Sequence, residues 1–264
     1  MAFDEFITPL TMGNYTVRFC ENEKELKDYQ DLRYRYLILE FDPGKKDDAK
    51  EGVTDFNMDY DKNTAQLCAF FTDPETGKTE LVGGYILMRF KKEDDFCKIT
   101  LKYDLSNLLK YKFEICEISR AVLHPNHRSS YVTKLLWDGI KSYVLKYKLR
   151  YIIGTMSFMG LDPLKYIQAA SYLHYKYRMP EDIMVRPVES SAYYHKYLDQ
   201  ESVNKKTAVG QLPPLLKGLL MLGAKTGDGF YIDHDLGVVE TFAVLDNHLN
   251  NYDMSNFAKK KALS

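Results

Sequence analysis

The order of strand and helix patterns around residues 113–158 constrains the fold more than any other feature. Phe113–Leu123 is predicted as a strand, and His124-Pro125-Asn126 interrupts it. Apolar residues then recur with helical spacing over Val132–Tyr147, and Tyr151–Phe158 is a second apolar run. A strand, a helix and a second strand in this order predict a parallel crossover in the middle of a sheet.

Further patterns flank this block on both sides. A strand is predicted at Tyr15–Cys20, and a helix begins after Asn22. The other predicted elements are a hairpin, a helix, a short strand and a final strand, at Ala65–Phe71 with Leu81–Phe90, Asp162–Tyr177, Ile183–Val188 and Val238–Leu245. This order predicts a mixed sheet with helices on both faces. We expect one domain over residues 1–264, with a C-terminal elaboration from about residue 180.

The composition excludes several classes of protein. The 36 Lys and Arg residues nearly balance the 37 Asp and Glu residues, so no overall field would draw the chain to nucleic acid. The N-terminal MAFDEFITPL carries acids where a signal peptide needs bases, and no apolar run approaches the roughly 20 residues that span a bilayer. We therefore expect a cytoplasmic protein whose 4 cysteines are reduced core residues.

Arg33 stands inside the apolar stripe of the first predicted helix. It follows Tyr29 by four residues and precedes Tyr36 by three, which is helical spacing. A buried guanidinium needs an anionic partner, either a carboxylate of the chain or a substrate carboxylate. The alternative is an arginine at the edge of the stripe whose long stem reaches solvent.

The segment after this helix is long and polar and carries three regularly spaced acids. Asp55, Asp59 and Asp61 alternate with large apolar side chains in DFNMDYD. This alternation favours a segment that docks on the core and presents its acids inward. Calcium is a competing explanation, but the segment lacks the glycine and the distal glutamate of an EF-hand loop.

The strand before the crossover helix carries polar residues where a central strand should be apolar. Glu117 and Ser119 share one face, and Arg120 points to the other face unless a bulge turns it. An ion pair between Glu117 and Arg120 would be a purely structural explanation. An acid, a hydroxyl and a base so close together in a buried strand favour a functional site.

The residues that open the crossover helix suggest an anion site. Pro125 prevents the helical geometry that would bring His124 and His127 onto one metal ion, so we predict no metal there. Arg128-Ser129-Ser130 then precedes a helix whose free amides would suit a phosphate. The serines are also ordinary helix N-caps.

The run EISRAVLHPNHRSSYVTKLLWDGI resembles the central motif of the ornithine–acyl-carrier-protein N-acyltransferases. That family is similar to the N-acyl-homoserine lactone synthases. Further matches are the helix around Arg33 with Asp59 and Asp61 downstream, the strand IIGTMSF followed by Asp162-Pro163, and PPLLKGLLMLGAKTGDGFYID. Together these motifs cover most of the chain, and their order is more specific than any one of them.

The resemblance implies an α/β fold of GNAT type, in three αβα layers with a mixed sheet that splays at its centre. It also implies that Arg33, Asp59, Glu117 and Arg120 correspond to the polar cluster of the lactone synthases. The glycine turn that GNAT acetyltransferases close on coenzyme A is here Arg128-Ser-Ser-Tyr-Val-Thr, without glycine. We therefore expect the thioester of an acyl carrier protein as co-substrate, held near Arg128, Ser129 and Ser130, and no bound cofactor.

The implied reaction is acylation of an amino acid's α-amine, with ornithine as the expected acceptor and a (3-hydroxy)fatty acyl group as donor. Glu117 is the candidate base, close to Ser119, and backbone amides of its strand would bind the oxyanion. Arg33 and Arg120 suit the acceptor's carboxylate. Asp59 and Asp61 would receive a second ammonium group.

Several alternatives remain open from the sequence. A signal synthase making an N-acyl amino acid or an acyl lactone, and a catalytically silent carrier-binding module, are the other functions considered. The apolar segment Leu212–Gly223 is either core or a transient contact with the membrane surface. His248 and Asp253 fit the H-x-x-x-x-D pattern of O-acyltransferases by chance, so a separate O-acyltransferase is expected as partner for a second step.

Overall fold

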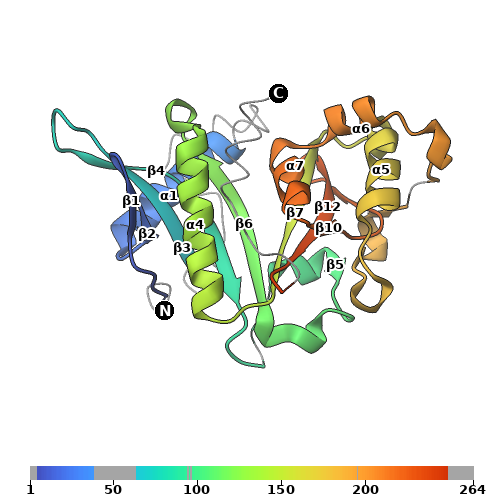
Figure 1. The fold of residues 1–264 in the computed structure, drawn as a ribbon, viewed down its shortest axis with the longest axis horizontal. Helices are drawn as coiled ribbons and strands as arrows, with labels where there is room; N and C mark the ends of the chain where they lie inside the picture. Colours follow the sequence, from blue (N-terminus) through green and yellow to red (C-terminus); the bar gives the residue numbers. More distant parts are fainter. Residues whose placement is uncertain (1–4, 39–63, 94, 96, 195, 249–264) are drawn as a thin grey trace. The chain divides into compact units, whose positions relative to one another are not determined.

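The computed structural model describes residues 5–38, 64–93, 95, 97–194 and 196–248. The chain divides into two compact units, coloured by sequence in Figure 1. Unit 1 comprises the described parts of Met1–Arg89 with Cys116–Leu149, and unit 2 those of Phe90–Ile115 with Arg150–Tyr252. A single domain with an elaboration from about residue 180, and the parallel pairing of the two crossover strands, stay predictions.

Unit 1 contains an antiparallel sheet of order β1-β2-β3-β4-β6. Its strands are β1 (Leu10–Met12), β2 (Tyr15–Phe19), β3 (Ala65–Thr72), β4 (Thr79–Arg89) and β6 (Ile115–Leu123). The predicted hairpin is confirmed as β3 and β4, joined by a turn in which Asp73 accepts hydrogen bonds from the amides of Glu75 and Thr76.

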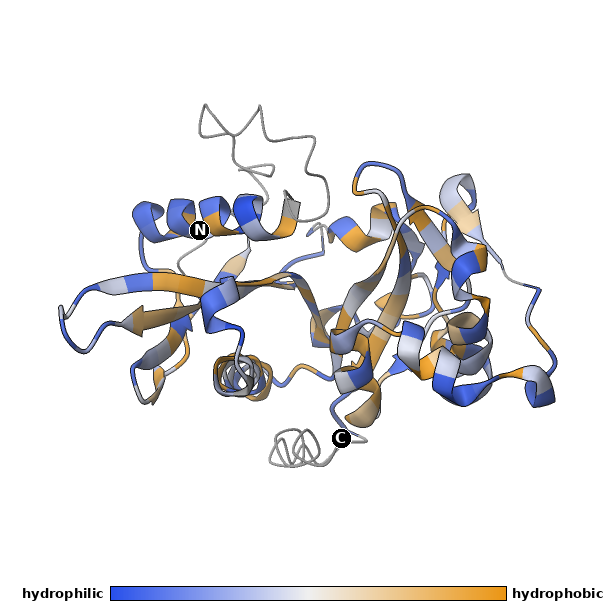
Figure 2. Cartoon of the chain, turned by 90° about the horizontal axis from the view of Figure 1, so that it is seen from above, coloured by the Kyte–Doolittle hydropathy of each residue, from blue (hydrophilic) through white to orange (hydrophobic). Residues whose placement is uncertain are grey.

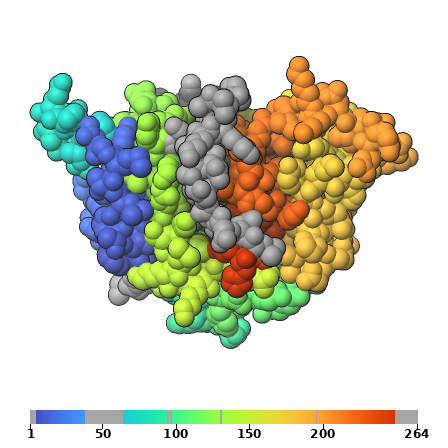
Figure 3. Space-filling model, in the orientation of Figure 1, coloured from blue at the N-terminus to red at the C-terminus, as the bar shows by residue number. Residues whose placement is uncertain are grey.

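One helix covers each face of this sheet. Helix α1 (Glu23–Arg33) and helix α4 (Ser130–Lys146) lie on opposite sides of the strands, with α4 seen end-on in Figure 2. Gly139 of α4 lies against Val17 and Leu67, whereas Tyr29 of α1 lies against Gly84. In Figure 3 the surface of α4 adjoins that of the N-terminal strands.

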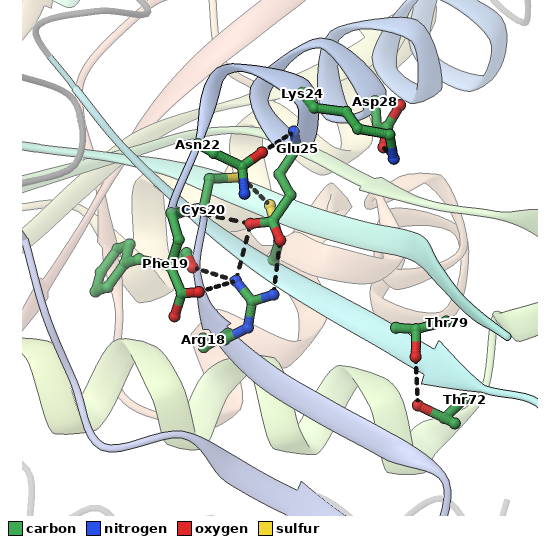
Figure 4. Close-up of polar contacts among 11 residues, drawn as sticks. Arg18, Phe19, Cys20, Asn22, Lys24, Glu25, Asp28, Thr72 and Thr79 are labelled. Carbon is green, nitrogen blue, oxygen red and sulfur yellow. Dashed lines mark hydrogen bonds and ion pairs between the residues drawn. The ribbon is translucent and has the colours of Figure 1, made fainter. Parts of the chain in front are cut away.

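The start of α1 is fixed to the sheet by polar contacts drawn in Figure 4. The Asn22 side chain caps the helix by accepting a hydrogen bond from the amide of Glu25 at 3.0 Å. Arg18 of β2 donates two hydrogen bonds to the Glu25 carboxylate, at 2.9 and 2.7 Å. The Arg18 guanidinium also lies 4.1 Å from the centre of the Phe70 ring. Sheet and helix are therefore joined by a bidentate ion pair.

Within unit 2 the strands pair antiparallel in the order β7-β12-β11-β9, and β10 also pairs with β12. Its strands are β7 (Tyr151–Met159), β9 (Ala192–Tyr193), β10 (Lys225–Thr226), β11 (Phe230–Asp233) and β12 (Val238–Asp246). A separate two-stranded ribbon pairs β5 (Tyr103–Asp104) with β8 (Arg186–Pro187).

The described part of unit 2 contains the helices α5 (Ile167–Tyr177), α6 (Lys205–Gln211) and α7 (Pro214–Met221). Only the first of them was predicted from the sequence. The predicted helix from Asp162 begins instead as a 3₁₀ turn that Asp162 caps, because its side chain accepts from the Leu164 amide. The strand predicted at Ile183–Val188 shrinks to β8, since a 3₁₀ turn takes up its start.

Short turns complete the chain. A short π-helix, η1, spans Tyr34–Ile38. The 3₁₀ turns η3 to η9 are, in chain order, Lys98–Leu101, Leu109–Glu114, Pro125–His127, Pro163–Tyr166, Glu181–Ile183, Glu189–Ser191 and Gln200–Ser202.

The apolar segment near the C-terminus belongs to the core. Leu216, Leu219 and Leu220 of α7 are buried. This favours core packing over insertion at a membrane surface. In the described part of the chain, no helix has both the length and the apolar character needed to cross a bilayer. The 4 cysteines are buried and free, as predicted.

We expect Arg18→Met to lower the free energy of unfolding by about 1–3 kcal/mol at pH 7, measured by urea denaturation. Its hydrogen bonds hold the pKa of Glu25 below its ordinary value. A carboxyl with a lowered folded pKa contributes stability above its unfolded pKa and loses it as the pH falls through the folded value. The difference from the native protein should therefore shrink towards pH 3.

Lys24→Met is the matched control, because its ion pair with Asp28 is exposed. An equal loss for Arg18→Met at both pH values would assign the effect to packing on Phe70 instead.

Candidate active site

Two of the predicted site residues lie on the face of β6 that α1 covers. Ser119 pairs with Ile86 of β4, and Glu117 pairs with Met88. Ile86 belongs to the buried cluster that contains Tyr29 of α1. Cross-strand partners share a face, so Glu117 and Ser119 also face α1. Glu117 is 6% exposed, which makes it one of the few buried acids of unit 1.

A β-bulge interrupts β6 immediately after these residues. The register passes from Ile86 opposite Ser119 to Gly84 opposite Val122, so Tyr85 on β4 faces both Arg120 and Ala121. The backbone of Arg120 has a φ of 54°, in the left-handed region that non-glycine residues rarely adopt. The sequence made the direction of Arg120 conditional on a bulge without locating one, and the structure has a bulge at this position.

Tyr29 holds this bulge from the helix side. Its hydroxyl donates a hydrogen bond of 2.9 Å to the carbonyl oxygen of Arg120. The ring is fully buried, and it fits because Gly84 opposite has no side chain. A Cβ at Gly84 would lie 3.0 Å from the Tyr29 ring and 2.5 Å from the Leu67 carbonyl oxygen. Sequence reasoning placed Tyr29 in the apolar stripe but missed its hydroxyl, whose partner is distant along the chain.

Arg33 lies one helical turn after Tyr29 and is 0% exposed. Its guanidinium carbon is 4.9 Å from the centre of the Tyr29 ring. The alternative in which its stem reaches solvent is therefore wrong. Such deep burial of a permanent charge requires compensating charge or polar groups nearby.

The backbone changes form directly after Arg33. Helix α1 ends there, and a short π-helix, Tyr34–Ile38, follows it directly. π-Helical turns are rare in proteins, and many of those known lie at functional sites. Two unusual backbone segments, this turn and the bulge at Arg120, thus adjoin the side chains predicted from sequence.

A pair of buried thiols lies on the same side of the sheet. The sulfur atoms of Cys20 and Cys68 are 3.3 Å apart. Burial raises the pKa of the Cys68 thiol, and its contact with Cys20 acts in the same direction, while the nearby Arg33 charge opposes both. The Cys68 thiol therefore stays protonated and acts as an apolar core group.

The predicted anion-binding residues lie at the start of α4. The Ser129 side chain caps the helix, accepting from the Val132 amide at 3.4 Å. Arg128 is exposed, and its Nε donates to the Leu123 carbonyl oxygen at 3.2 Å. Ser130 is the first residue of α4. The structure confirms the N-cap role of Ser129 and brings Arg128 beside it.

The two histidines before this helix have structural partners. The Nδ1 atom of His127 is 3.0 Å from the Tyr15 hydroxyl, and His124 accepts from the Asn126 amide. Burial holds the pKa of His127 below its ordinary value. Within the described ranges, no three His, Cys, Asp or Glu side chains are grouped as a metal site.

The acids of the polar segment, Asp55, Asp59 and Asp61, lie outside the described residues. Of the other predictions, the structure brings Arg33, Glu117 and Ser119 to one side of one sheet, next to the bulge at Arg120. A buried acid and a buried cation on the same side of a sheet can together hold a polar substrate and move a proton.

Comparison with known proteins gives these residues a context. A model of the acetyltransferase (GNAT) domain matches residues 32–138, which include Arg33, Glu117 and the start of α4. An L-ornithine N(alpha)-acyltransferase of Brucella abortus is 29% identical over 89% of this chain and 85% of its own length. The enzyme of the same name from Rhodobacter capsulatus is 24% identical over 88% of this chain and 90% of its own.

Solved structures are more distant. FeeM, an N-acyl amino acid synthase from uncultured soil microbes, aligns with a TM-score of 0.44 and 10% identity, over 90% of this chain and 92% of its own. The CoA-dependent acyl-homoserine lactone synthase BjaI aligns with a TM-score of 0.45 and 12% identity, over 85% of this chain and 76% of its own. The sequence matches confirm the predicted resemblance and the α/β fold of GNAT type, and they identify an N-acyltransferase.

We expect Arg120→Gly to raise the free energy of unfolding by about 1 kcal/mol, because glycine adopts a φ of 54° without strain. N-acyl transfer should fall, since the side chain is lost and the bulge is free to relax. Urea denaturation and turnover of the same preparation measure the two effects.

Lys148 is the matched control, with a φ of 53° in the turn after α4. Lys148→Gly should give a similar stabilisation with unchanged turnover. If Arg120→Gly instead destabilises the protein, contacts of the guanidinium outweigh the backbone strain.

Proposed function

We propose that this N-acyltransferase transfers a (3-hydroxy)fatty acyl group from acyl carrier protein to the α-amine of ornithine, giving a lyso-aminolipid. The observation that carries the proposal is the match to relatives named L-ornithine N(alpha)-acyltransferase over about nine-tenths of the chain. The buried Arg33 and Glu117 on one face of unit 1 support it, because an amino-acid acceptor presents both a carboxylate and an amine.

The reaction needs a proton acceptor and a site for negative charge. An amino acid's α-amine is largely protonated at neutral pH and must lose a proton before or during attack. In the proposed mechanism Glu117 accepts that proton, directly or through a water. The nitrogen attacks the thioester carbonyl and the C–N bond forms. The C–S bond then breaks, and the departing thiolate takes up the second proton that the nitrogen loses, which releases the carrier thiol. Ser119, two residues away on the same face, would orient the amine or the water.

The bulge suits the developing oxyanion. In a regular ladder, backbone amides of a central strand are committed to neighbouring strands. A bulge takes residues out of that pattern and re-aims their groups. In this proposal, backbone amides at the bulge near Arg120 stabilise the tetrahedral intermediate, and the Tyr29 hydrogen bond preorganises them. Arg33 and Arg120 would hold the acceptor's carboxylate.

The donor is proposed from the start of α4. The segment Arg128-Ser-Ser-Tyr-Val-Thr has no glycine with which to close on a pyrophosphate. Carrier-bound phosphopantetheine has a single phosphate, which Arg128 and the first amides of α4, near Ser129 and Ser130, could bind. No further cofactor is required. A carrier-protein donor would place the reaction in the cytoplasm, and a separate O-acyltransferase would complete the lipid.

Glu117→Gln tests the base. We expect acyl transfer to fall about 10²- to 10⁴-fold, because glutamine has the same size but accepts no proton. Purified protein with 3-hydroxyacyl carrier protein and ornithine should release thiol, and mass spectrometry identifies the product. Glu114→Gln, three residues earlier in the chain, is the matched control and should keep full activity. Undiminished turnover of Glu117→Gln would remove Glu117 from the mechanism.

The donor has its own test. We expect kcat/KM for acyl carrier protein to exceed that for the same acyl coenzyme A at least about tenfold, the ratio that 1.4 kcal/mol of differential binding gives. Arg128→Ala should lower the value for the carrier-protein donor and leave the circular dichroism spectrum unchanged. Equal use of both donors would contradict the carrier-protein assignment. A lactone product would favour a signal synthase.

A further inference from the structure

A group of aromatic side chains in unit 1 surrounds the turn between β6 and α4, and the proposed mechanism does not use it. The centre of the His127 ring lies 4.9 Å from that of Phe71 and 5.8 Å from that of Tyr15. Phe71 and Tyr15 are cross-strand partners on β3 and β2. Tyr15 shares a face with Val17, which α4 covers. His127 is therefore packed on the α4 side of the sheet.

The groups around the His127 ring determine where its proton lies. Nδ1 is 3.0 Å from the Tyr15 hydroxyl, and Nε2 is 3.6 Å from Oε1 of Glu80. Burial holds the pKa of His127 below its ordinary value, so the ring is neutral near pH 7. A neutral ring has one donor nitrogen, and it is the one beside the carboxylate, because a lone pair there would be repelled. The Tyr15 hydroxyl therefore donates to Nδ1.

A second histidine holds the same turn from the side of α1. The ring of His124 lies 4.8 Å from that of Tyr36, in the π-helix that follows α1, and 5.5 Å from that of His127. Tyr36 in turn packs against the buried cluster that contains Tyr29. The turn is thus tied to both faces of one sheet by four rings, which we call the aromatic clamp: Tyr15, Tyr36, His124 and His127.

The backbone of this turn fixes the direction of Arg128. The amide of Ser129 donates a hydrogen bond of 2.7 Å to the carbonyl oxygen of His127. Arg128 lies between them with a φ of −70° and a ψ of 72°, the angles of an inverse γ-turn. Its Nε also donates to the Leu123 carbonyl oxygen at 3.2 Å. A displacement of His127 would therefore pass directly to Arg128 and to the helix cap, Ser129.

From these contacts we infer that His127, held by the hydroxyl of Tyr15, is a positioning residue for the phosphate of the acyl donor. It holds the turn that aims Arg128 and presents the first amides of α4. His124 and Tyr36 support the same turn from the opposite face. The inference rests on the proposed function, and it adds to it the residues that preorganise the donor site.

Preorganisation of the turn favours phosphate binding. Ordering a mobile backbone and a long arginine side chain opposes binding, and a turn that is already held avoids part of that loss. The effect should be specific to the donor. Tyr15 and His127 lie on the α4 side of the sheet, whereas Glu117 faces α1. Loss of the Tyr15 hydroxyl should therefore leave the binding of the amino acid unchanged.

The test compares two small donors with the same 3-hydroxyacyl group, S-acyl-4′-phosphopantetheine and S-acyl-pantetheine, which differ only in the phosphate. With ornithine as acceptor, we expect the native kcat/KM to be at least about tenfold higher for the phosphorylated donor. Tyr15→Phe and His127→Phe should each lower this ratio about three- to tenfold, with KM for ornithine nearly unchanged.

Tyr175→Phe is the matched control. It removes the same atom from a hydroxyl that donates to the Leu198 carbonyl oxygen at 2.8 Å in unit 2, and it should keep the native ratio. The double variant of Tyr15 and His127 should lower the ratio no further than the larger single effect, because either change removes the same hydrogen bond. Losses that multiply would contradict a role of Tyr15 through His127.

Circular dichroism checks that each variant is folded. If His127→Phe does not fold, Tyr15→Phe decides by itself, because it removes a single oxygen atom. If the native protein uses neither small donor, KM for acyl carrier protein replaces the ratio, and it should rise about three- to tenfold in Tyr15→Phe while KM for ornithine stays constant.

Other outcomes would overturn the inference. A native preference for the phosphorylated donor that both variants retain would refute the positioning role alone. Equal losses with both donors in folded variants would make the aromatic clamp purely structural. Equal native use of both small donors would remove the phosphate site, and the positioning role with it. No turnover with these donors or with acyl carrier protein would refute the proposed function itself.

Discussion

The hydrogen bond from the Tyr29 hydroxyl to the Arg120 carbonyl is the interaction on which the site of unit 1 depends. It joins α1 to the only part of β6 that departs from a regular ladder among the described strand residues. The bulge keeps an unfavourable backbone angle at Arg120, so it needs a partner that holds it. A buried phenol fixed on a helix is such a partner. The Tyr29 ring also contacts the guanidinium of Arg33. One side chain therefore contacts both the bulge and the buried arginine.

The periodicity of the sequence predicted α1, α4 and the long strands because these patterns are local. Asn22 is recognisable as a cap, and Ile86 and Ser119 follow the alternation of a strand. The bulge was not predictable, because it depends on how β6 pairs with β4. The same reason applies to the ion pairs of Lys102 with Asp233 and Glu240, because these partners lie more than a hundred residues from Lys102 in the sequence. Helical spacing places Arg33 in the apolar stripe, but only the structure decides between burial and a stem that reaches solvent.

Both units bury ionic groups, which is costly for a chain of this size. Arg33 and Glu117 in unit 1, and Glu240 in unit 2, are less exposed than many of the leucines. Apolar residues of similar volume would often stabilise a core as well or better. Polar groups fix directions that apolar packing leaves open, because each donor needs a particular acceptor. The charged groups therefore define geometry within each unit, and the apolar core supplies most of the stability.

Gly84 sets the distance between α1 and its sheet. The missing side chain lets the Tyr29 ring rest on the strand, and even one methyl group would meet backbone at 2.5 Å. An alanine would have to displace both the Leu67 backbone of β3 and the Tyr29 ring of α1, and the Arg33 guanidinium rests against that ring. No single substitution of Gly84 can therefore leave the helix where it is. Attempts to alter acceptor choice by redesign have to leave this contact intact and work from the strands instead.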